Sequence, residues 1–256
     1  MINKRLHNLS LLLSLLLSAG MMTGCSLTSK QQPEIIPAQR TLSDNPDITT
    51  YPMRVYDPIE GFNRGTYKFN AKFDQYVFLP VVNGYEFITP VFVQTGIGNF
   101  FSNLGEFTNL TNSIFQLKPK SSLYALSRFV INSTVGLAGL WDHATRWGIL
   151  EHPEDFGQTM GHYGVGDGPY LVIPIMGPMN TRDGAGLLVD SLAYGAVYGA
   201  AFNFDNNTGA AAAFQSTRAI SKRQQTKFRY NQSGSPFEYD FVRYLYTQKR
   251  KMEIAK

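Results

Sequence analysis

Residues 57–76, DPIEGFNRGTYKFNAKFDQY, decide the fold class of this chain of 256 residues. Mostly apolar side chains recur there at alternating spacings of three and four, at Ile59, Phe62, Thr66, Phe69, Phe73 and Tyr76. Polar side chains such as Asn63 and Lys68 lie on other faces, and this pattern predicts an amphipathic helix. Residues 57–60 suit its N-terminus, because an acidic cap, a proline and then a glutamate form a capping box.

Two later segments repeat the same spacing on either side of Lys118-Pro119. The first carries Ile97, Phe100, Leu104, Phe107, Thr111 and Ile114, and the second carries Leu123, Leu126, Val130, Ser133, Leu137 and Leu140. Only residues 170–175, which Pro174 interrupts, look extended. The sequence therefore predicts an all-α fold in a single domain, and 43% hydrophobic residues are enough to exclude a disordered chain.

Residues 184–202, GAGLLVDSLAYGAVYGAAF, contain one charged residue, Asp190. As a helix this segment would be about 28 Å long, close to the thickness of the hydrocarbon layer of a membrane. Gly195 and Gly199 have the small-xxx-small spacing that lets another backbone approach closely. Two interpretations stay open, a buried core helix and a helix that lies against or within lipid.

The N-terminal 24 residues have the parts of a secretory signal. Lys4 and Arg5 precede a leucine-rich run, and small residues end directly before Cys25, the only cysteine of the chain. This arrangement resembles a bacterial lipobox, which implies cleavage after residue 24 and acylation of Cys25 with several chains, enough for stable anchoring. Ser26 resembles the residue that follows the cysteine in lipoproteins sorted to the outer membrane. The alternative is a coincidental cysteine after a plain signal.

The mature chain divides by composition and charge. Residues 25–56 are rich in Pro, Ser, Thr and Gln without a period, which predicts a flexible lipidated tether before a helical domain at 57–230 and a basic C-terminal helix at 231–256. Residues 207–256 hold ten Lys or Arg against three acidic residues. The cations that stand out are Arg218, Lys222, Arg223, Lys227, Arg229, Lys249, Arg250 and Lys251. They form either solvated helix faces or a surface drawn to anionic headgroups or an acidic partner. Export argues against nucleic acid as a partner.

Several kinds of chemistry lack their motifs. No P-loop, G-x-S-x-G or H-E-x-x-H motif occurs, so we expect no enzyme, no cofactor and no metal site. His162 lies in a glycine-rich turn, where we expect it to satisfy buried backbone groups. The alternative is a site in which His143, His152 or His162, near Glu154, binds a metal or acts as acid and base.

Two blocks of the sequence resemble a known family. Asp57-Pro58-Ile59-Glu60-Gly61-Phe62-Asn63-Arg64 is similar to the D-P-x-E-x-x-N-R start of the MlaA/VacJ outer-membrane lipoproteins. Their F-G-x-T-x-G-x-x-G-V-x-x-G-P-Y block resembles residues 156–170, which include Gly161, His162, Tyr163, Gly164, Gly168, Pro169 and Tyr170. Residues 129–136 and 181–183 continue the likeness, which covers about residues 57–190.

The resemblance implies a ring-like helical protein with amphipathic helices in the inner half of the outer membrane, beside a trimeric porin. Phospholipids misplaced in the outer leaflet would pass through its amphipathic channel to a soluble periplasmic lipid-binding protein, which keeps the membrane asymmetric. The family motif at Phe62 and Asn63 would shape the channel, and deleting that pair should disturb lipid asymmetry. Two other classes stay open, a structural envelope lipoprotein and a lipid or glycan hydrolase that uses His162 or His152 with a serine.

Overall fold

The computed structural model describes residues 55–204 and 207–256. The predicted signal peptide, Cys25 and the tether up to residue 54 therefore lie outside the described residues. At Tyr56 the chain is already attached to the fold, because the backbone N–H of Tyr170 donates a hydrogen bond of 3.0 Å to the carbonyl of Tyr56.

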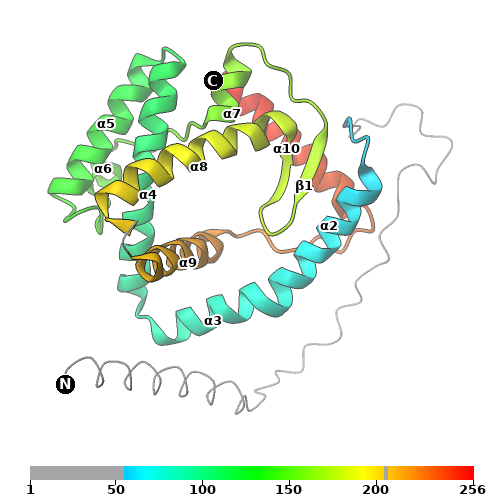
Figure 1. The fold of residues 1–256 in the computed structure, drawn as a ribbon, viewed down its shortest axis with the longest axis horizontal. Coiled ribbons are helices and arrows are strands. Elements are labelled where there is room, and N and C mark those ends of the chain that lie inside the picture. Colours follow the sequence, from blue (N-terminus) through cyan, green and yellow to red (C-terminus); the bar gives the residue numbers. More distant parts are fainter. Residues whose placement is uncertain (1–54, 205–206) are drawn as a thin grey trace. The chain divides into compact units, whose positions relative to one another are not determined.

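The predicted all-α class is confirmed, with one β-hairpin as the exception (Figure 1). In chain order the elements are α2 (Glu60–Phe73), the π-helix η2 (Asp74–Phe78), α3 (Leu79–Ile88), α4 (Val91–Phe115), α5 (Pro119–Thr134), α6 (His143–Arg146), α7 (Phe156–His162), β1 (Tyr170–Ile173), β2 (Gly177–Asn180), α8 (Thr181–Ala201), α9 (Thr208–Gln225) and α10 (Glu238–Ala255). β1 and β2 pair antiparallel, with Tyr170 opposite Asn180. The sequence predicts β1 but not β2, because Gly177 and Pro178 are poor strand formers.

The elements of this folded unit are arranged around a central opening (Figure 1). α8 follows one side of it, α2 and α3 follow the opposite side, α4 and α9 lie at one end, and the hairpin lies at the other. α10 runs behind the hairpin. α4 packs along α5, and α7 packs along α8, so the opening has two-layered walls on those sides.

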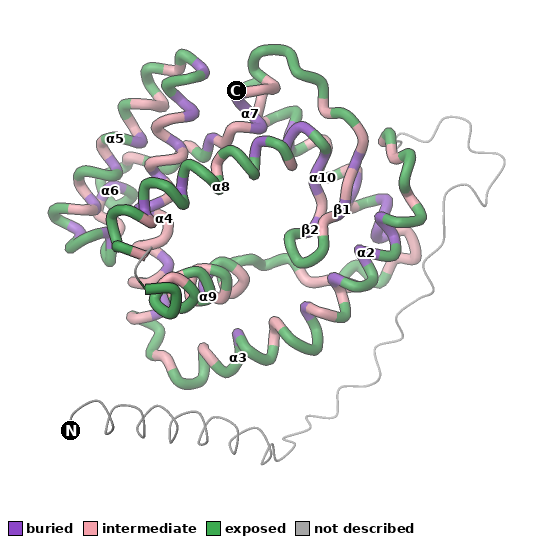
Figure 2. Tube along the Cα trace, viewed as in Figure 1, coloured by how far each residue is buried: buried purple, intermediate pink, exposed green. Residues whose placement is uncertain are grey.

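Several helices bury polar side chains and expose apolar ones, and Figure 2 shows where the buried and exposed positions lie along the chain. The buried residues of α2 are Asn63, Arg64, Thr66, Tyr67 and Asn70. Ile59, Phe62 and Phe69 of its apolar stripe are exposed instead. In the same way α5 buries Arg128 and Asn132 but exposes Leu123, Leu126 and Val130. The predicted helical spacing is correct as far as Phe73 and Ser133, but Tyr76 lies in η2, and Leu137 and Leu140 lie beyond the end of α5. The side that faces the protein is largely the polar one.

The predicted capping box of α2 is wrong. Ile59 is the N-cap residue, and no side chain accepts a cap hydrogen bond there. The Asp57 carboxylate is used elsewhere, because it accepts hydrogen bonds from Asn63 Nδ2 and from Arg243 Nη1, at 2.8 and 2.9 Å. A tertiary contact has thus replaced the local one.

α8 spans the segment for which two interpretations were open. Tyr194 and Tyr198 are buried while Leu188 and Leu192 are exposed, so one face packs on the protein and the other does not. Gly195 and Gly199 have nothing within 4 Å of an added Cβ, and the close backbone approach predicted for them is wrong within the described residues. That approach occurs at Gly186, where a Cβ would lie 2.3 Å from the backbone nitrogen of Gly157 in α7. None of the helices in the described ranges is both long and apolar enough to cross a membrane.

Two aromatic clusters fill the spaces between elements. Tyr67, Tyr170, Val172 and Tyr239 join α2, β1 and α10. Leu104, Tyr194 and Tyr198 join α4 and α8, with Phe214 of α9 packed against them. The clusters lie in different parts of the fold, so the apolar core is divided rather than central.

Candidate functional site

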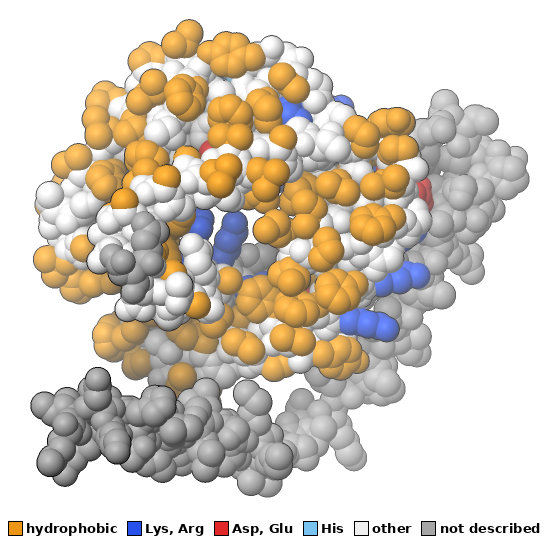
Figure 3. All heavy atoms as spheres, viewed as in Figure 1, with side chains coloured by type: hydrophobic (Ala, Val, Ile, Leu, Met, Phe, Trp, Pro, Cys, Tyr) orange, Lys and Arg blue, Asp and Glu red, His pale blue; other side chains and the backbone are white. Residues whose placement is uncertain are grey.

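The candidate site is the hollow in one face of the folded unit. Figure 3 shows this hollow between α8 and the elements opposite it, with a rim rich in hydrophobic side chains and with Lys or Arg side chains inside. The contacts that hold the surrounding elements in place determine the shape of this hollow.

Two asparagines of α2 hold the hairpin. Asn63 Nδ2 donates to the carbonyl of Tyr170 at 3.0 Å, and Asn63 Oδ1 accepts from the N–H of Val172 at 2.9 Å. Asn70 repeats the arrangement one heptad later, with bonds of 3.0 and 2.7 Å to the carbonyl of Ile173 and the N–H of Ile175. Each amide supplies one donor and one acceptor, as a neighbouring strand would. α2 therefore completes the free edge of β1.

α10 ties the start of α2 to the same junction. Arg243 Nη1 lies 2.9 Å from Asp57 Oδ2, and Arg243 Nη2 lies 2.6 Å from Asp240. Arg64 of α2 reaches Asp240 as well, at 2.8 Å. Burial alone would raise the pKa of the Glu60 carboxyl, but hydrogen bonds and charge from Arg64 and Arg243 outweigh it, so this pKa lies below its ordinary value. We call these contacts, with Asn63 and Asn70, the α2–hairpin junction.

Arg250 of α10, seven residues after Arg243, makes a second buried cluster. Its guanidinium lies 2.8 Å from Asp183 of α8 and 2.7 Å from Asp155, the N-cap residue of α7. The Tyr246 hydroxyl donates to Asp183 at 2.6 Å. Burial opposes ionisation of Asp155, but Arg250 overcomes it and lowers the pKa of that carboxyl. α10 thus joins α2 at one end and the α7–α8 pair at the other.

A π-helix positions α9. Asp74, the first residue of η2, accepts two hydrogen bonds of 2.6 Å from Arg223 of α9. Gln224 donates to Gln94 of α4 at 2.8 Å. These contacts fix the C-terminal part of α9 between η2 and α4.

The basic tail is only partly a solvated surface. Arg223 and Arg250, two of the cations that stand out in the sequence, are paired with carboxylates and largely removed from water. Arg218 stacks on the ring of Tyr194, with its guanidinium carbon 3.9 Å from the ring centroid. Lys222 keeps contact with solvent, yet the surrounding protein, followed by the charges of Arg218 and Lys249, lowers the pKa of its ammonium.

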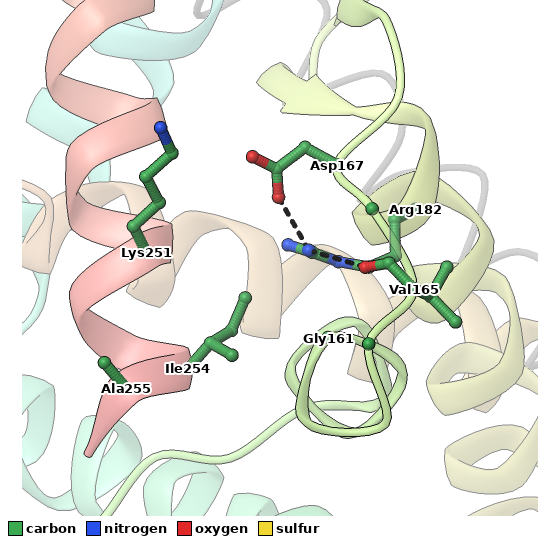
Figure 4. Close-up of a pocket in the computed structure, with 9 residues that line it drawn as sticks. Gly161, Val165, Asp167, Arg182, Lys251, Ile254 and Ala255 are labelled. Atoms are coloured by element: carbon green, nitrogen blue, oxygen red, sulfur yellow. Dashed lines mark hydrogen bonds and ion pairs between the residues drawn. The ribbon is translucent and has the colours of Figure 1, made fainter.

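The glycine-rich block splits into two parts. Tyr170 belongs to the α2–hairpin junction, so the two sequence blocks meet there. Residues 161–167 instead border a separate pocket of about 320 Å³ against the end of α10 (Figure 4). Arg182 points into it but is already paired, with Asp167 at 2.6 Å. Lys251 extends from α10 along its other side.

The histidines of the described residues lie against different aromatic side chains. His162 is exposed and makes an edge-on ring contact with Tyr163, so the expected role in satisfying buried backbone groups is wrong. His152 stacks on Tyr124 with ring centroids 4.7 Å apart. In the described ranges no group of three His, Cys, Asp or Glu residues is arranged to hold a metal ion.

Sequence reasoning missed the partners of the first block. Asn70, Tyr239 and Arg243 carry as much of the junction as Asp57 and Asn63 do. A heptad spacing relates Asn63 to Asn70 and Arg243 to Arg250, which places each pair on one helix face. Polar residues at helical spacing were therefore the available signal. Phe62, which precedes Asn63 in the first sequence block, is by contrast 61% exposed.

Comparisons with known proteins agree with this architecture. The family described as MlaA lipoprotein matches residues 55–253. An uncharacterised protein of Rickettsia prowazekii is 37% identical over 167 residues, which are 62% of this chain and 63% of that protein. The intermembrane phospholipid transport system lipoprotein MlaA of Escherichia coli is 36% identical over 141 residues, covering 52% of this chain and 55% of its own. Its Haemophilus influenzae counterpart is 31% identical over 183 residues, covering 70% and 66%.

A solved structure from a study of the structural basis for maintenance of bacterial outer membrane lipid asymmetry is also similar. It shares 30% sequence identity and has a TM-score of 0.63, with 78% of this chain and 100% of that chain covered. The matched part of the present chain spans less than two thirds of the length of each curated relative named above.

Proposed function

This chain belongs to the MlaA lipoprotein family, and from that premise we propose that it carries phospholipids in the outer membrane. Mislocalised phospholipids leave the outer leaflet through the central opening and pass to a soluble periplasmic lipid-binding protein, and the membrane stays asymmetric. The observation that carries this proposal is the inverted surface: the helices bury polar side chains against one another and expose apolar ones, and Lys or Arg side chains are visible in the hollow behind a hydrophobic rim (Figure 3).

The inverted surface suits a lipid with two unlike ends. Phe87, Val91 and Phe92 at the α3–α4 turn are 88%, 75% and 78% exposed. Burying a large apolar side chain gains about 1.5–3 kcal/mol, so this surface favours contact with acyl chains over water. A headgroup can cross the polar opening while its tails remain near apolar helix faces, which avoids exposing them to water. No bond is made or broken in this process.

The same surface supports the proposed location. An acylated Cys25 would hold the protein on the periplasmic side of the outer membrane, and the apolar side chains of α3, α5 and α8 would enter the inner leaflet. A trimeric porin beside it would give the opening a path to the outer leaflet. These partners come from the family resemblance, and the exposed helix faces supply the area they need.

The experiment is complementation of a deletion strain, with outer-leaflet phospholipid measured by surface labelling. Expression of the unaltered chain should lower surface phospholipid, and Cys25→Ala should not. Deletion of Phe62 and Asn63 should raise surface phospholipid again, because it removes a junction side chain and turns the rest of α2 away from the hairpin.

Asn63→Ala and Asn83→Ala form a matched pair for this experiment. Both residues lie on the α2–α3 edge, but Asn63 is buried against β1 while Asn83 is exposed. We expect only Asn63→Ala to impair complementation. Normal surface phospholipid in the deletion strain would instead favour a structural lipoprotein. Loss of function in His162→Ala with an unchanged protein level would favour a hydrolase.

A further inference from the structure

The two tryptophans of the chain lie at one corner of the fold. Trp141 and Trp147 flank the short helix α6, and their side chains are 47% and 58% exposed. We call residues 135–150 the α5–α6 corner. Figure 1 shows α6 beside α5, at the outer edge of the folded unit. Aliphatic side chains of the corner are exposed as well, at Val135, Leu137, Leu140 and Leu150.

Buried polar side chains of α5 hold the corner from inside. Asn132 accepts a hydrogen bond of 3.0 Å from the N–H of Ala144, in α6. Arg128 donates a hydrogen bond of 2.7 Å to the carbonyl of Ile149, beyond the end of α6. Both side chains are almost completely buried. The polar groups of the corner are thus used within the protein, and the apolar side chains remain outside.

The loop that joins α5 to α6 has an unfavourable backbone. Leu137, Ala138 and Gly139 follow one another with φ values of 47°, 57° and 89°, in the left-handed region that leucine and alanine rarely adopt. The N–H of Gly139 donates back to α5 at 2.7 Å, and Asn99 of α4 donates to the carbonyl of Leu140 at 3.0 Å. Such a backbone persists only where its surroundings fix it, so the exposed side chains are held in a defined place.

The uncompensated charge of the corner is positive. Asp142 caps α6 and lies 3.3 Å from Arg128, and Glu151, just past the corner, accepts a bond of 3.4 Å from Ser102 of α4. Arg146 is exposed, and none of the described carboxylates lies within ion-pair distance of it. Neither indole N–H donates a hydrogen bond to a described residue. The corner therefore offers a guanidinium and two indole donors beside apolar side chains.

We propose that the α5–α6 corner is a membrane anchor, which holds Trp141 and Trp147 at the boundary between lipid headgroups and acyl chains and places Arg146 against lipid phosphate. This inference rests on the proposed function and names the part of the exterior that sets the depth of the protein in the leaflet. An indole suits this boundary because its ring is apolar and its N–H can donate to phosphate or ester oxygens.

Two observations assign the corner to lipid rather than to a protein partner. Its apolar surface continues that of the α3–α4 turn, because a Cβ on Gly96 of α4 would lie 3.7 Å from the Leu140 side chain, and Gly96 follows Phe92 by one helical turn. The second observation is charge, since Arg146 complements the phosphate of every phospholipid headgroup and the net charge of anionic lipids.

The intrinsic fluorescence of the full chain tests this placement directly, because both tryptophans belong to the corner. The chain is added to vesicles of phosphatidylcholine and phosphatidylglycerol, in which the phosphatidylcholine carries bromine atoms either high on its acyl chains or near their terminal methyl groups. We expect a larger loss of emission with the bromines near the headgroup. A larger loss with the deep bromines overturns the proposed depth. Blue-shifted emission that neither lipid quenches means that protein covers the corner, and it overturns the assignment to lipid.

Tryptophan variants locate the signal. Trp141→Phe and Trp147→Phe each leave one indole, and we expect the shallow bromines to quench both variants. Met252→Trp, in a chain with both of those substitutions, is the matched control. Met252 is 67% exposed on α10 and follows the charged residues 249–251, so quenching should be weaker there. Equal quenching at position 252 would show that the corner has no special place in the membrane.

A charge variant tests the contact with phosphate. Arg146→Gln should weaken binding to vesicles rich in phosphatidylglycerol about fivefold. Lys251→Gln removes the same charge from an exposed position on α10 and should have a smaller effect. Equal effects would mean that net charge, rather than Arg146, drives the attraction. The Trp141→Ser, Trp147→Ser double variant should bind about tenfold more weakly, with or without phosphatidylglycerol.

The outcomes separate this inference from the proposed function. Absence of vesicle binding by the unaltered chain, measured by flotation, counts against the proposed function and the anchor together. Vesicle binding without quenching by either brominated lipid overturns the anchor alone, because the membrane contact would then lie elsewhere on the exterior.

Discussion

The α2–hairpin junction lies near one end of the continuous helix formed by α2, η2 and α3, and the α3–α4 turn lies at its other end. The two regions nevertheless treat polar and apolar side chains in opposite ways. At the junction Asn63, Arg64 and Asn70 are buried and bonded. At the turn Phe87 and Phe92 contact almost nothing in the chain. A polar interior tolerates few substitutions, because every hydrogen-bond donor or acceptor that loses its partner stays buried away from water. An apolar exterior tolerates more substitutions, because little of its surface is buried within the chain.

The largest expected effect is at the buried charges that α10 brings to the interior. Arg250→Ala leaves Asp155 without its cation and leaves Asp183 paired with Arg182 alone. Breaking a buried ion pair from one side costs about 3–5 kcal/mol, since the remaining charge is uncompensated. The free energy of unfolding, measured by urea denaturation in detergent, should fall by that amount.

Lys251→Ala is the control for this substitution. Lys251 follows Arg250 on the same helix, is exposed, and should change the free energy of unfolding by less than about 0.5 kcal/mol. Equal losses in the two variants would mean that helix propensity, rather than the buried cluster, limits stability at this end of α10.

A smaller effect is expected at the α2–hairpin junction. Asn63→Ala removes the partner of the Val172 N–H and of the Tyr170 carbonyl, at about 1–3 kcal/mol in all. Hydrogen exchange should report it locally, as faster exchange of the Val172 amide. The Ile175 amide, which Asn70 holds, should be affected less. Unchanged protection at Val172 would show that β2 alone orders the hairpin.

This contrast also shows what a sequence reveals. A spacing of three and four residues reports that a segment is helical, and it did so for α2, α4 and α5. The spacing does not predict which face of the helix packs against the protein, because that depends on the surroundings of the folded chain. Asp57 illustrates the limit: its local signal is a helix cap, but Arg243, 186 residues later, takes its carboxylate. The hairpin partner Asn63 was within reach of sequence comparison, whereas Tyr239 and Arg243 lie beyond the two recognisable blocks.

Acid should weaken the polar junctions before it affects the apolar surface. The pKa values of Glu60 and Asp155 lie below their ordinary values of 4.5 and 3.8, so their ion pairs stabilise the folded state above those values. That stability is lost as the pH falls through the lower folded-state pKa values, because the unfolded chain binds protons first. Urea midpoints measured between pH 7 and pH 3 should fall below about pH 4.

Arg250→Ala tests the origin of this acid sensitivity. Without Arg250 the Asp155 carboxyl keeps its burial but loses the charge that lowers its pKa, so the acid-side decline should become shallower. The buried carboxyls of Glu106 and Asp190 have raised pKa values and act in the opposite direction, since acid relieves their burial. A decline as steep as in the unaltered chain would place the acid-sensitive charge outside the Arg250 cluster.

The smallest effect on folding is expected at the apolar exterior, and there the comparison is sharpest. Phe92 is 78% exposed near the start of α4, so Phe92→Ser removes little buried area and exchanges residues of similar helix propensity. The free energy of unfolding should change by less than about 0.5 kcal/mol. Phe101→Ser, in the aromatic cluster on the same helix, should cost more because Phe100 and Phe214 pack against it.

Binding to phospholipid vesicles should show the reverse order: Phe92→Ser should weaken it about tenfold or more, because the phenyl ring gains most of its burial from lipid. Equal losses of stability and equal vesicle binding in the two variants would contradict this prediction. They would mean that the exposed apolar side chains do not contribute to membrane binding.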